Sequence, residues 1–290
     1  MPDAPSGGSV NVNGIRLSYW DWGGSGQTAL LIHGLASTHH IWDLVAPILT
    51  RDFRVVVLDQ RGHGESDKPD TGYDFATVAS DLNGAIQALG LGAPVIAGHS
   101  WGGNVALEHG ATFPNETKGL CLIDGGAIEV SGNFESLDEA KVQMAPPDFS
   151  GMTLDDLRAR SAQRSWGFEI TPEIREIVFS NFEVLEDGTI RAQLSRQNHM
   201  RVIEAFWDQR PSQIFPRVQR PVLLMPTRGG GDRSSVEWKE RSEKAMTAAG
   251  TGLPVSKTVW LEDSVHDVPL QRPGLVAGVI ADAYKSGFFG

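Results

Sequence analysis

The chain contains a single cysteine, Cys121, among its 290 residues. One cysteine excludes an internal disulfide, and with it the disulfide frameworks of small secreted proteins. Cys121 stands in the apolar stretch GLCLID. This setting predicts a small buried side chain rather than a nucleophile or a metal ligand.

Positive charge is also scarce, because 25 Lys and Arg residues stand against 36 Asp and Glu residues and leave a formal net charge of −11. Without a basic run, the chain is expected to bind neither nucleic acid nor an anionic membrane surface. No apolar run approaches the length of about 18 residues that a membrane-spanning helix needs. Residues 1–10 lack the basic and apolar segments of a signal peptide, so we expect a cytoplasmic protein.

Short apolar stretches, typical of strands buried on both faces, alternate along the chain with segments of helical periodicity. A hairpin is expected around Asn13 and Gly14. Further strands are predicted within 27–34, 53–64, 93–98, 117–126, 221–227 and 256–263, and helices within 40–50, 74–90, 104–113, 234–250 and 273–287. This order predicts an α/β fold with a mostly parallel, eight-stranded sheet flanked by helices.

Residues 127–215 interrupt this alternation. They contain no buried-strand pattern, but they carry helix signals and many Phe, Trp and Met side chains. We expect a helical cap inserted between the core segments 1–126 and 216–290, above the carboxyl edge of the sheet, where ligands bind in such folds. Most of its aromatic side chains should fill the cap itself, and the rest should line a pocket.

Ser100 stands between two glycines in GHSWGG, where the strand APVIAG gives way to a helix. A serine on such a sharp turn presents its hydroxyl above the sheet, and glycines are needed because Cβ atoms would clash with the neighbouring strand and helix. The pentapeptide alone is a weak signal, but its position between strand and helix makes it specific. The pattern predicts a nucleophilic serine.

Four stretches in this order resemble the α/β-hydrolase family: LLIHG (30–34) with Leu35 after it, DQRGHGES (59–66), GHSWGG (98–103) and SVHDVPLQRP (264–273). They span nearly the whole chain except the insertion. The resemblance implies that Ser100 attacks a carbonyl and that His266, which follows the last strand, is its base. It also implies an oxyanion hole formed by the backbone amides of Trp101 and Leu35.

Two aspartates compete for the acid that orients His266. Asp232 follows the strand PVLLMPT, which is the commonest place for the acid in this family, but it lies in a lengthened, glycine-rich loop. Asp124 ends the strand GLCLID and is followed by two glycines, and some branches of the family place the acid there. We prefer Asp124 and keep Asp232 as the alternative.

The other histidines have more ordinary interpretations. His33 and His63 belong to the matched stretches, and we expect buried structural hydrogen bonds from both. His99 is expected to pack within the turn. His39 and His40 are expected either to line the mouth of the pocket or, as the preferred interpretation, to make surface or cap contacts. No histidine cluster has metal-ligand spacing, and no phosphate-binding or dinucleotide-binding motif occurs, so no metal and no cofactor is predicted.

The sequence therefore predicts a cofactor-free serine hydrolase that cleaves carboxylic esters or lactones of small to medium hydrophobic substrates, acting as a monomer or homodimer. Haloperoxidase or perhydrolase activity, carbon–carbon bond hydrolysis and hydroxynitrile lyase chemistry use the same three residue types and stay open as alternatives. A hydrolase-like ligand receptor is a further alternative. Epoxide hydrolases and haloalkane dehalogenases of this fold need an aspartate nucleophile, so Ser100 argues against both.

Overall fold

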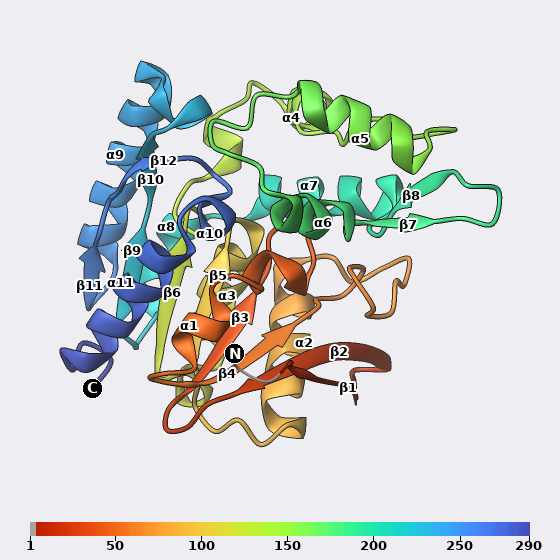
Figure 1. Ribbon diagram of the computed structural model, residues 1–290. Helices are drawn as coiled ribbons and strands as arrows, with labels where there is room; N and C mark the ends of the chain where they lie inside the picture. Colours follow the sequence, from red (N-terminus) through yellow and green to blue (C-terminus); the bar gives the residue numbers. More distant parts are fainter. Residues whose placement is uncertain (1–3) are drawn as a thin grey trace.

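An eight-stranded sheet forms the centre of the molecule (Figure 1). The computed structural model describes residues 4–290, apart from the side chain of Asp232. The strand order is β1-β2-β4-β3-β5-β6-β9-β11. The strands are β1 (Ser6–Val12), β2 (Ile15–Gly23), β3 (Thr28–Ile32), β4 (Arg54–Leu58), β5 (Val95–His99), β6 (Gly119–Ile123), β9 (Val222–Met225) and β11 (Ser256–Thr258). Only β1 and β2 run antiparallel to their neighbours, which confirms the predicted sheet.

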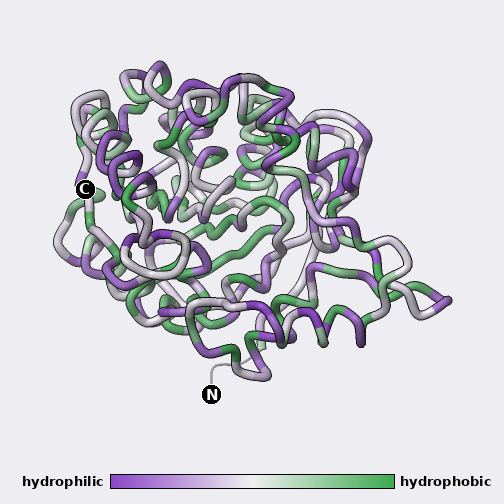
Figure 2. The backbone as a smooth tube through the Cα atoms, turned by 90° about the horizontal axis from the view of Figure 1, so that it is seen from above, coloured by the Kyte–Doolittle hydropathy of each residue, from purple (hydrophilic) through white to green (hydrophobic). Residues whose placement is uncertain are grey.

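Helices cover both faces of this sheet, as predicted, because its central strands are apolar on both sides. In β3, Leu30 and Ile32 join one hydrophobic cluster, whereas Ala29 and Leu31 join the other. The first cluster includes side chains of α2 (Phe75–Ala88), α3 (Trp101–Thr112) and α9 (Val236–Gly252). The second includes side chains of α1 (Ala46–Leu49), α10 (Val268–Gln271) and α11 (Pro273–Lys285). Figure 2 shows the apolar strands at the centre of the molecule.

Two predicted elements are divided in the structure. The helix expected over 40–50 is split into a 3₁₀ turn, η1 (His39–Trp42), and the short α1. Both pieces bury apolar side chains, so the spacing that suggested one helix is satisfied by two turns. The strand expected over 256–263 is divided into β11 and β12 (Leu261–Ser264), and β12 pairs with β10 (Thr227–Gly229) outside the main sheet. This small β10–β12 sheet lies directly before His266.

Residues 127–215 lie above the carboxyl edge of the sheet (Figure 1). Their helices are α4 (Leu137–Gln143), α5 (Leu154–Gln163), α6 (Pro172–Phe179), α7 (Arg196–Asp208) and α8 (Pro211–Ile214), after the turn η3 (Val130–Gly132). A hairpin of β7 (Phe182–Val184) and β8 (Ile190–Ala192) was not predicted, because its strands are only three residues long and mostly exposed. The segment is therefore mainly, but not purely, helical.

The aromatic side chains of this segment divide between several environments. Phe149, Phe179 and Phe182 pack with Leu157 and Ile190 into a separate small cluster. Phe206, by contrast, packs edge-on against Phe75 of α2, with ring centroids 5.5 Å apart.

None of the described helices is both long and apolar enough to cross a lipid bilayer. The remaining 3₁₀ turns are η2 (Pro114–Glu116), η4 (Phe215–Arg217) and η5 (Gly231–Ser234).

Candidate active site

Ser100 connects β5 directly to α3 in a strained backbone conformation, with φ 54° and ψ −121°. A non-glycine residue with positive φ is uncommon and marks a turn that the surrounding structure enforces. A Cβ on Gly102 would lie 2.6 Å from the carbonyl oxygens of Ile32 and His33, so the helix approaches β3 more closely than any side chain permits. The local geometry matches the predicted sharp turn.

His266 lies between β12 and α10 and faces Ser100. Its Nε2 is 3.0 Å from Ser100 Oγ, and its Nδ1 donates to Asp124 Oδ2 at 2.6 Å. The Asp124 side chain is 1% exposed and that of His266 is 32% exposed, so the carboxylate is sealed from solvent while the imidazole remains accessible. The three side chains thus form one continuous line of hydrogen bonds, with the expected contact between His266 and Asp124.

The sheet itself brings Ser100 and Asp124 together, because β5 and β6 are parallel neighbours. The Ser100 amide donates to the Ile123 carbonyl at 2.9 Å, and the Asp124 amide donates to Met225 of β9 at 3.1 Å. Asp124 has φ 45°. A Cβ on the next residue, Gly125, would lie 2.0 Å from the Ser100 carbonyl oxygen, so this turn packs against the backbone of Ser100.

Asp124 also accepts hydrogen bonds from two groups besides His266. The Thr227 amide donates to Oδ1 at 3.0 Å, and Arg233 Nε donates to Oδ2 at 3.1 Å. Burial alone would raise the pKa of Asp124. The hydrogen bond and charge of His266, the charge of Arg233 and the Thr227 amide together hold that pKa well below its usual range. Asp124 is therefore ionised at neutral pH.

The alternative acid, Asp232, belongs to η5, and its side chain lies outside the part of the chain that the structure describes. Its neighbour Arg233 is the residue of this loop that contacts Asp124. The sequence indicated this loop as a possible source of an acid but did not indicate a role for its arginine. An arginine beside an aspartate in a glycine-rich loop carries no distinctive signal, since the partner 109 positions away in the chain is set only by the fold.

His99 does more than pack within the turn. It is buried, and its Nε2 donates to the backbone carbonyl of His266 at 2.8 Å. The two imidazole rings lie 4.8 Å apart. Burial and the neighbouring His266 lower the pKa of His99 to about 4, so its ring is neutral over the ordinary pH range. His99 therefore holds the loop that carries His266 against the end of β5.

The loop after β3 flanks Ser100 on its other side. A Cβ on Gly34 would be 3.0 Å from the Cβ of Ser100, so the backbone before Leu35 lies against the serine. Trp101 is the first residue of α3, and its side chain is fully buried. The backbone at both predicted oxyanion-hole positions thus borders Ser100, and the N-terminus of α3 favours negative charge there.

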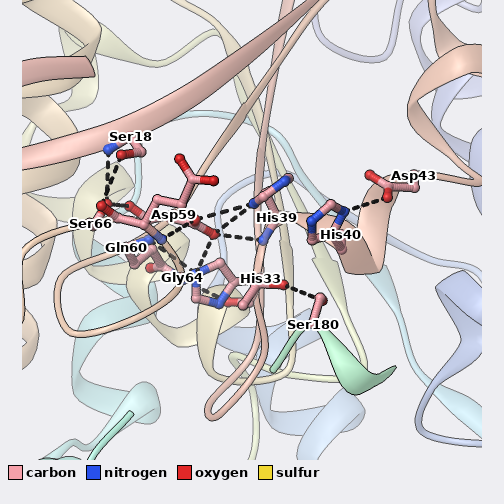
Figure 3. A network of polar contacts seen from close by, with 12 residues as sticks. Ser18, His33, His39, His40, Asp43, Asp59, Gln60, Gly64, Ser66 and Ser180 are labelled. Carbon is pink, nitrogen blue, oxygen red and sulfur yellow. Dashed lines mark hydrogen bonds and ion pairs between the residues drawn. The ribbon is translucent and has the colours of Figure 1, made fainter. Parts of the chain in front are cut away.

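A buried polar network supports this loop from below (Figure 3). Asp59, whose side chain is fully buried, accepts from the His39 amide at 2.7 Å and the Glu65 amide at 2.9 Å, and it lies 3.2 Å from His39 Nδ1. The His33 ring accepts from the Gln60 amide at 3.0 Å, and His63 accepts from the Ala36 amide at 3.2 Å.

This network confirms structural hydrogen bonding for His33 and His63. The expected surface position of His39 was wrong, because its side chain is 7% exposed and stacks on Trp20, with ring centroids 3.3 Å apart. His40 remains partly exposed and pairs with Asp43 at 2.6 Å. The contact of His39 with Asp59 and the contact of His40 with Asp43 hold η1 next to the site.

A pocket of about 400 Å³ adjoins His266. Its walls combine Arg164–Gly167 from the segment above the sheet with Gly231 and Val265–Asp267 from the loops after the strands. The Arg164 guanidinium stacks on the Trp166 ring at 4.4 Å. A second pocket of about 440 Å³ shares Arg164–Gly167 and adds Arg175 of α6. Among the residues that the structure describes, no three His, Cys, Asp or Glu side chains come together as a metal site.

Comparison with known proteins supports the fold. The sequence model of the alpha/beta hydrolase family matches residues 29–279. The N-formylmaleamate deformylase of Pseudomonas putida is 31% identical over 231 residues, which are 78% of this chain and 80% of that protein. A soluble epoxide hydrolase of a Corynebacterium species is 40% identical, but over 125 residues that make up 42% of this chain and 43% of the relative.

Among solved structures, the crystal structure of E-2-(acetamidomethylene)succinate hydrolase superposes with a TM-score of 0.77. Its sequence is 25% identical, and the match covers 96% of this chain and 98% of that one. The architecture therefore agrees over nearly the full length of both proteins, including residues 127–215. With the family match spanning most of the chain, this protein belongs to the alpha/beta hydrolase family.

Proposed function

We propose that the chain is a serine hydrolase that forms an acyl-enzyme on Ser100, with His266 as general base and acid and Asp124 as the residue that orients His266. The observation that carries this proposal is the hydrogen-bonded line from Ser100 Oγ through both nitrogens of His266 to Asp124. A free serine hydroxyl is a weak nucleophile, and an adjacent base held by a third group is what activates it.

In the proposed reaction, His266 Nε2 takes the proton of Ser100 as Oγ attacks the substrate carbonyl carbon. The amides of Leu35 and Trp101 donate to the oxyanion that forms. Collapse of the tetrahedral intermediate breaks the bond to the leaving group, which takes its proton from His266. His266 then takes a proton from water as the water oxygen attacks the acyl carbon. Collapse of this second tetrahedral intermediate breaks the bond to Ser100 Oγ, which takes its proton from His266, and the acid is released. Asp124 keeps its negative charge throughout and stabilises the imidazolium.

We further propose that the substrates are carboxylic esters or lactones with small to medium hydrophobic acyl groups. Residues 127–215 then act as a cap over a core formed by 1–126 and 216–290. The pocket beside His266 supports this proposal, because Trp166 adds an apolar side chain to the same pocket wall as the proposed base. A pocket of about 400 Å³ suits a small acyl compound.

A small acyclic amide that carries a carboxylate is the second candidate substrate. It is favoured by the similarity to the N-formylmaleamate deformylase and to the E-2-(acetamidomethylene)succinate hydrolase. The two pockets that meet at Trp166 also have Arg164 and Arg175 in their walls. A guanidinium binds a carboxylate through two parallel hydrogen bonds, so these arginines are suited to an anionic substrate.

The test combines labelling with turnover. A fluorophosphonate probe should label one serine per chain, and the Ser100→Ala variant should stay unlabelled. The parent protein is then assayed on p-nitrophenyl esters of increasing acyl length, on lactones, and on N-formyl and N-acetyl amides with and without a carboxylate. Turnover of esters or lactones supports the first candidate, and preference for anionic amides supports the second. Labelling without any turnover would indicate a ligand-binding protein instead of an enzyme.

A further inference from the structure

Arg233 contacts the same carboxylate oxygen of Asp124 as His266 does. It belongs to η5, in the loop between β10 and α9, and its Nε donates to Asp124 Oδ2 at 3.1 Å. The Arg233 side chain is only 13% exposed. Its guanidinium carbon lies 3.7 Å from the ring centroid of Trp238, in the first turn of α9. The arginine is therefore held by an aromatic plane as well as by the carboxylate.

The carboxylate of Asp124 is held by donors from three different parts of the chain. Oδ2 accepts from both His266 Nδ1 and Arg233 Nε, and Oδ1 accepts from the Thr227 amide. These donors fix the plane of the carboxylate, since rotation about its last bond would break all three contacts. The guanidinium also brings a positive charge to the oxygen on which His266 depends.

We propose that Arg233 is a positioning residue for the reaction put forward above, and this inference rests on that proposed function. Arg233 fixes the orientation of Asp124 and offsets part of its negative charge. As a result, His266 stays neutral, and able to accept the Ser100 proton, at a lower pH than it would if Asp124 had no arginine beside it. The physical reason is electrostatic: a carboxylate that shares its charge with a guanidinium stabilises an imidazolium less strongly.

Other charged or titratable groups also face His266. His99 packs against the imidazole from β5, and its lowered pKa of about 4 keeps it neutral. Asp267 and Arg164 line the pocket next to His266 and have opposite charges. None of these groups changes when Arg233 is substituted, so a shift in pH dependence reports on the arginine itself.

The experiment measures the rate of fluorophosphonate labelling of Ser100 between about pH 5.5 and pH 9 in the parent protein and in Arg233→Gln and Arg233→Lys. Labelling needs the activated serine but no natural substrate. In Arg233→Gln the midpoint of the rising pH profile should move upward by about one pH unit. The labelling rate should therefore fall by about tenfold at the acid end and by less than about threefold at pH 9. Arg233→Lys keeps the charge and should keep the midpoint near that of the parent.

Arg228→Gln is the matched control. Arg228 lies in β10, stacks on Trp260 at 4.6 Å and pairs with Glu262, and none of the hydrogen bonds or ion pairs within the described part of the chain joins it to Asp124. Its variant should keep the parent profile, and thermal melts should show that all variants fold. An equal loss at every pH in Arg233→Gln, or the same shift in Arg228→Gln, overturns the role of Arg233. A parent protein that is not labelled at Ser100 overturns the proposed function, and with it this inference.

Discussion

The two sides of the candidate site are built in different ways. On the Ser100 side, the loops after β3, β4 and β5 are fixed by close backbone contacts and by buried hydrogen bonds, such as those around Asp59. On the His266 side, the loops after β6, β10 and β12 meet through ionisable side chains: Asp124, Arg233 and His266 itself. In the proposed reaction, the first side acts as a frame, whereas the second acts as a proton-transfer system whose behaviour depends on charge.

From this difference we expect substitutions on one side to change the reaction rate and substitutions on the other to change the free energy of unfolding. A change on the His266 side should affect rate and pH profile while the fold survives, since these side chains lie at loop ends. A change in the Asp59 network should affect the free energy of unfolding, because it leaves buried polar groups without partners. The predictions that follow test this contrast between the two sides of the site.

The largest effect is expected for Ser100→Ala, which removes the proposed nucleophile. Loss of a nucleophilic serine from such a set costs on the order of 10⁶ in kcat. Covalent labelling by a fluorophosphonate should disappear, and hydrolysis of the best substrate should fall to the background rate. Near-parent hydrolysis of p-nitrophenyl acetate by this variant would show that another group is the nucleophile.

The next largest effect is expected for Asp124→Asn. An amide in place of the carboxylate leaves the wrong tautomer of His266 accessible and should cost on the order of 10⁴ in kcat. Asp232→Asn is the paired variant and should stay near the parent rate, with folding of both checked by thermal melts. The reverse result, an inactive Asp232→Asn and an active Asp124→Asn, would return the acid to the loop after β10.

On the frame side, Asp59→Asn should lower stability. Burial opposes ionisation of Asp59, but its hydrogen bond to His39, the charges of His39 and His33 and the Glu65 amide lower its pKa to about 2. Because this pKa is depressed on folding, the ionised carboxylate stabilises the fold at neutral pH, and that contribution is lost as pH falls from about 4 through about 2. The shift corresponds to about 2 kcal/mol.

Urea unfolding of the parent and of Asp59→Asn, at pH 7 and at about pH 3, measures this contribution. The difference in unfolding free energy between the two proteins should shrink at the lower pH, because at about pH 3 the Asp59 carboxyl is mostly protonated in the unfolded chain, where its pKa is the ordinary 3.8, and must lose that proton on folding. Asp43→Asn is the control, because Asp43 pairs with the partly exposed His40. Equal stability of parent and Asp59→Asn at pH 7 would contradict the idea of a rigid frame.

The smallest effect is expected for Trp166→Ala, which enlarges the pocket beside His266. Relative kcat/KM across acyl chain lengths should shift toward longer chains by about tenfold, the low end of what one methylene is worth in an apolar pocket. Trp207→Ala, in α7, is the comparison. Unchanged profiles in both variants would mean that neither tryptophan contributes to substrate selection.

Much of the fold was predictable because its signals are local. Buried apolar strands, helical periodicity and the glycines around Ser100 each specify structure within a few residues, and the predicted eight-stranded sheet was confirmed. The β7–β8 hairpin was not predicted, since three-residue exposed strands have no clear alternation. The division of 256–263 into β11 and β12 was also missed, because pairing with β10 depends on residues about 30 positions earlier.

The sequence by itself determined the strand-to-helix turn at Ser100, the core strands and the candidate positions of His266 and Asp124. Only the tertiary structure decided which charged groups surround these residues. The strand order places β6 between β5 and β9, so Asp124 lies within reach of the loops that carry His266 and Arg233. The donation from His99 to the His266 backbone has the same origin. Contacts across more than a hundred positions leave no periodic or local signal, because they arise from the order in which strands assemble into a sheet.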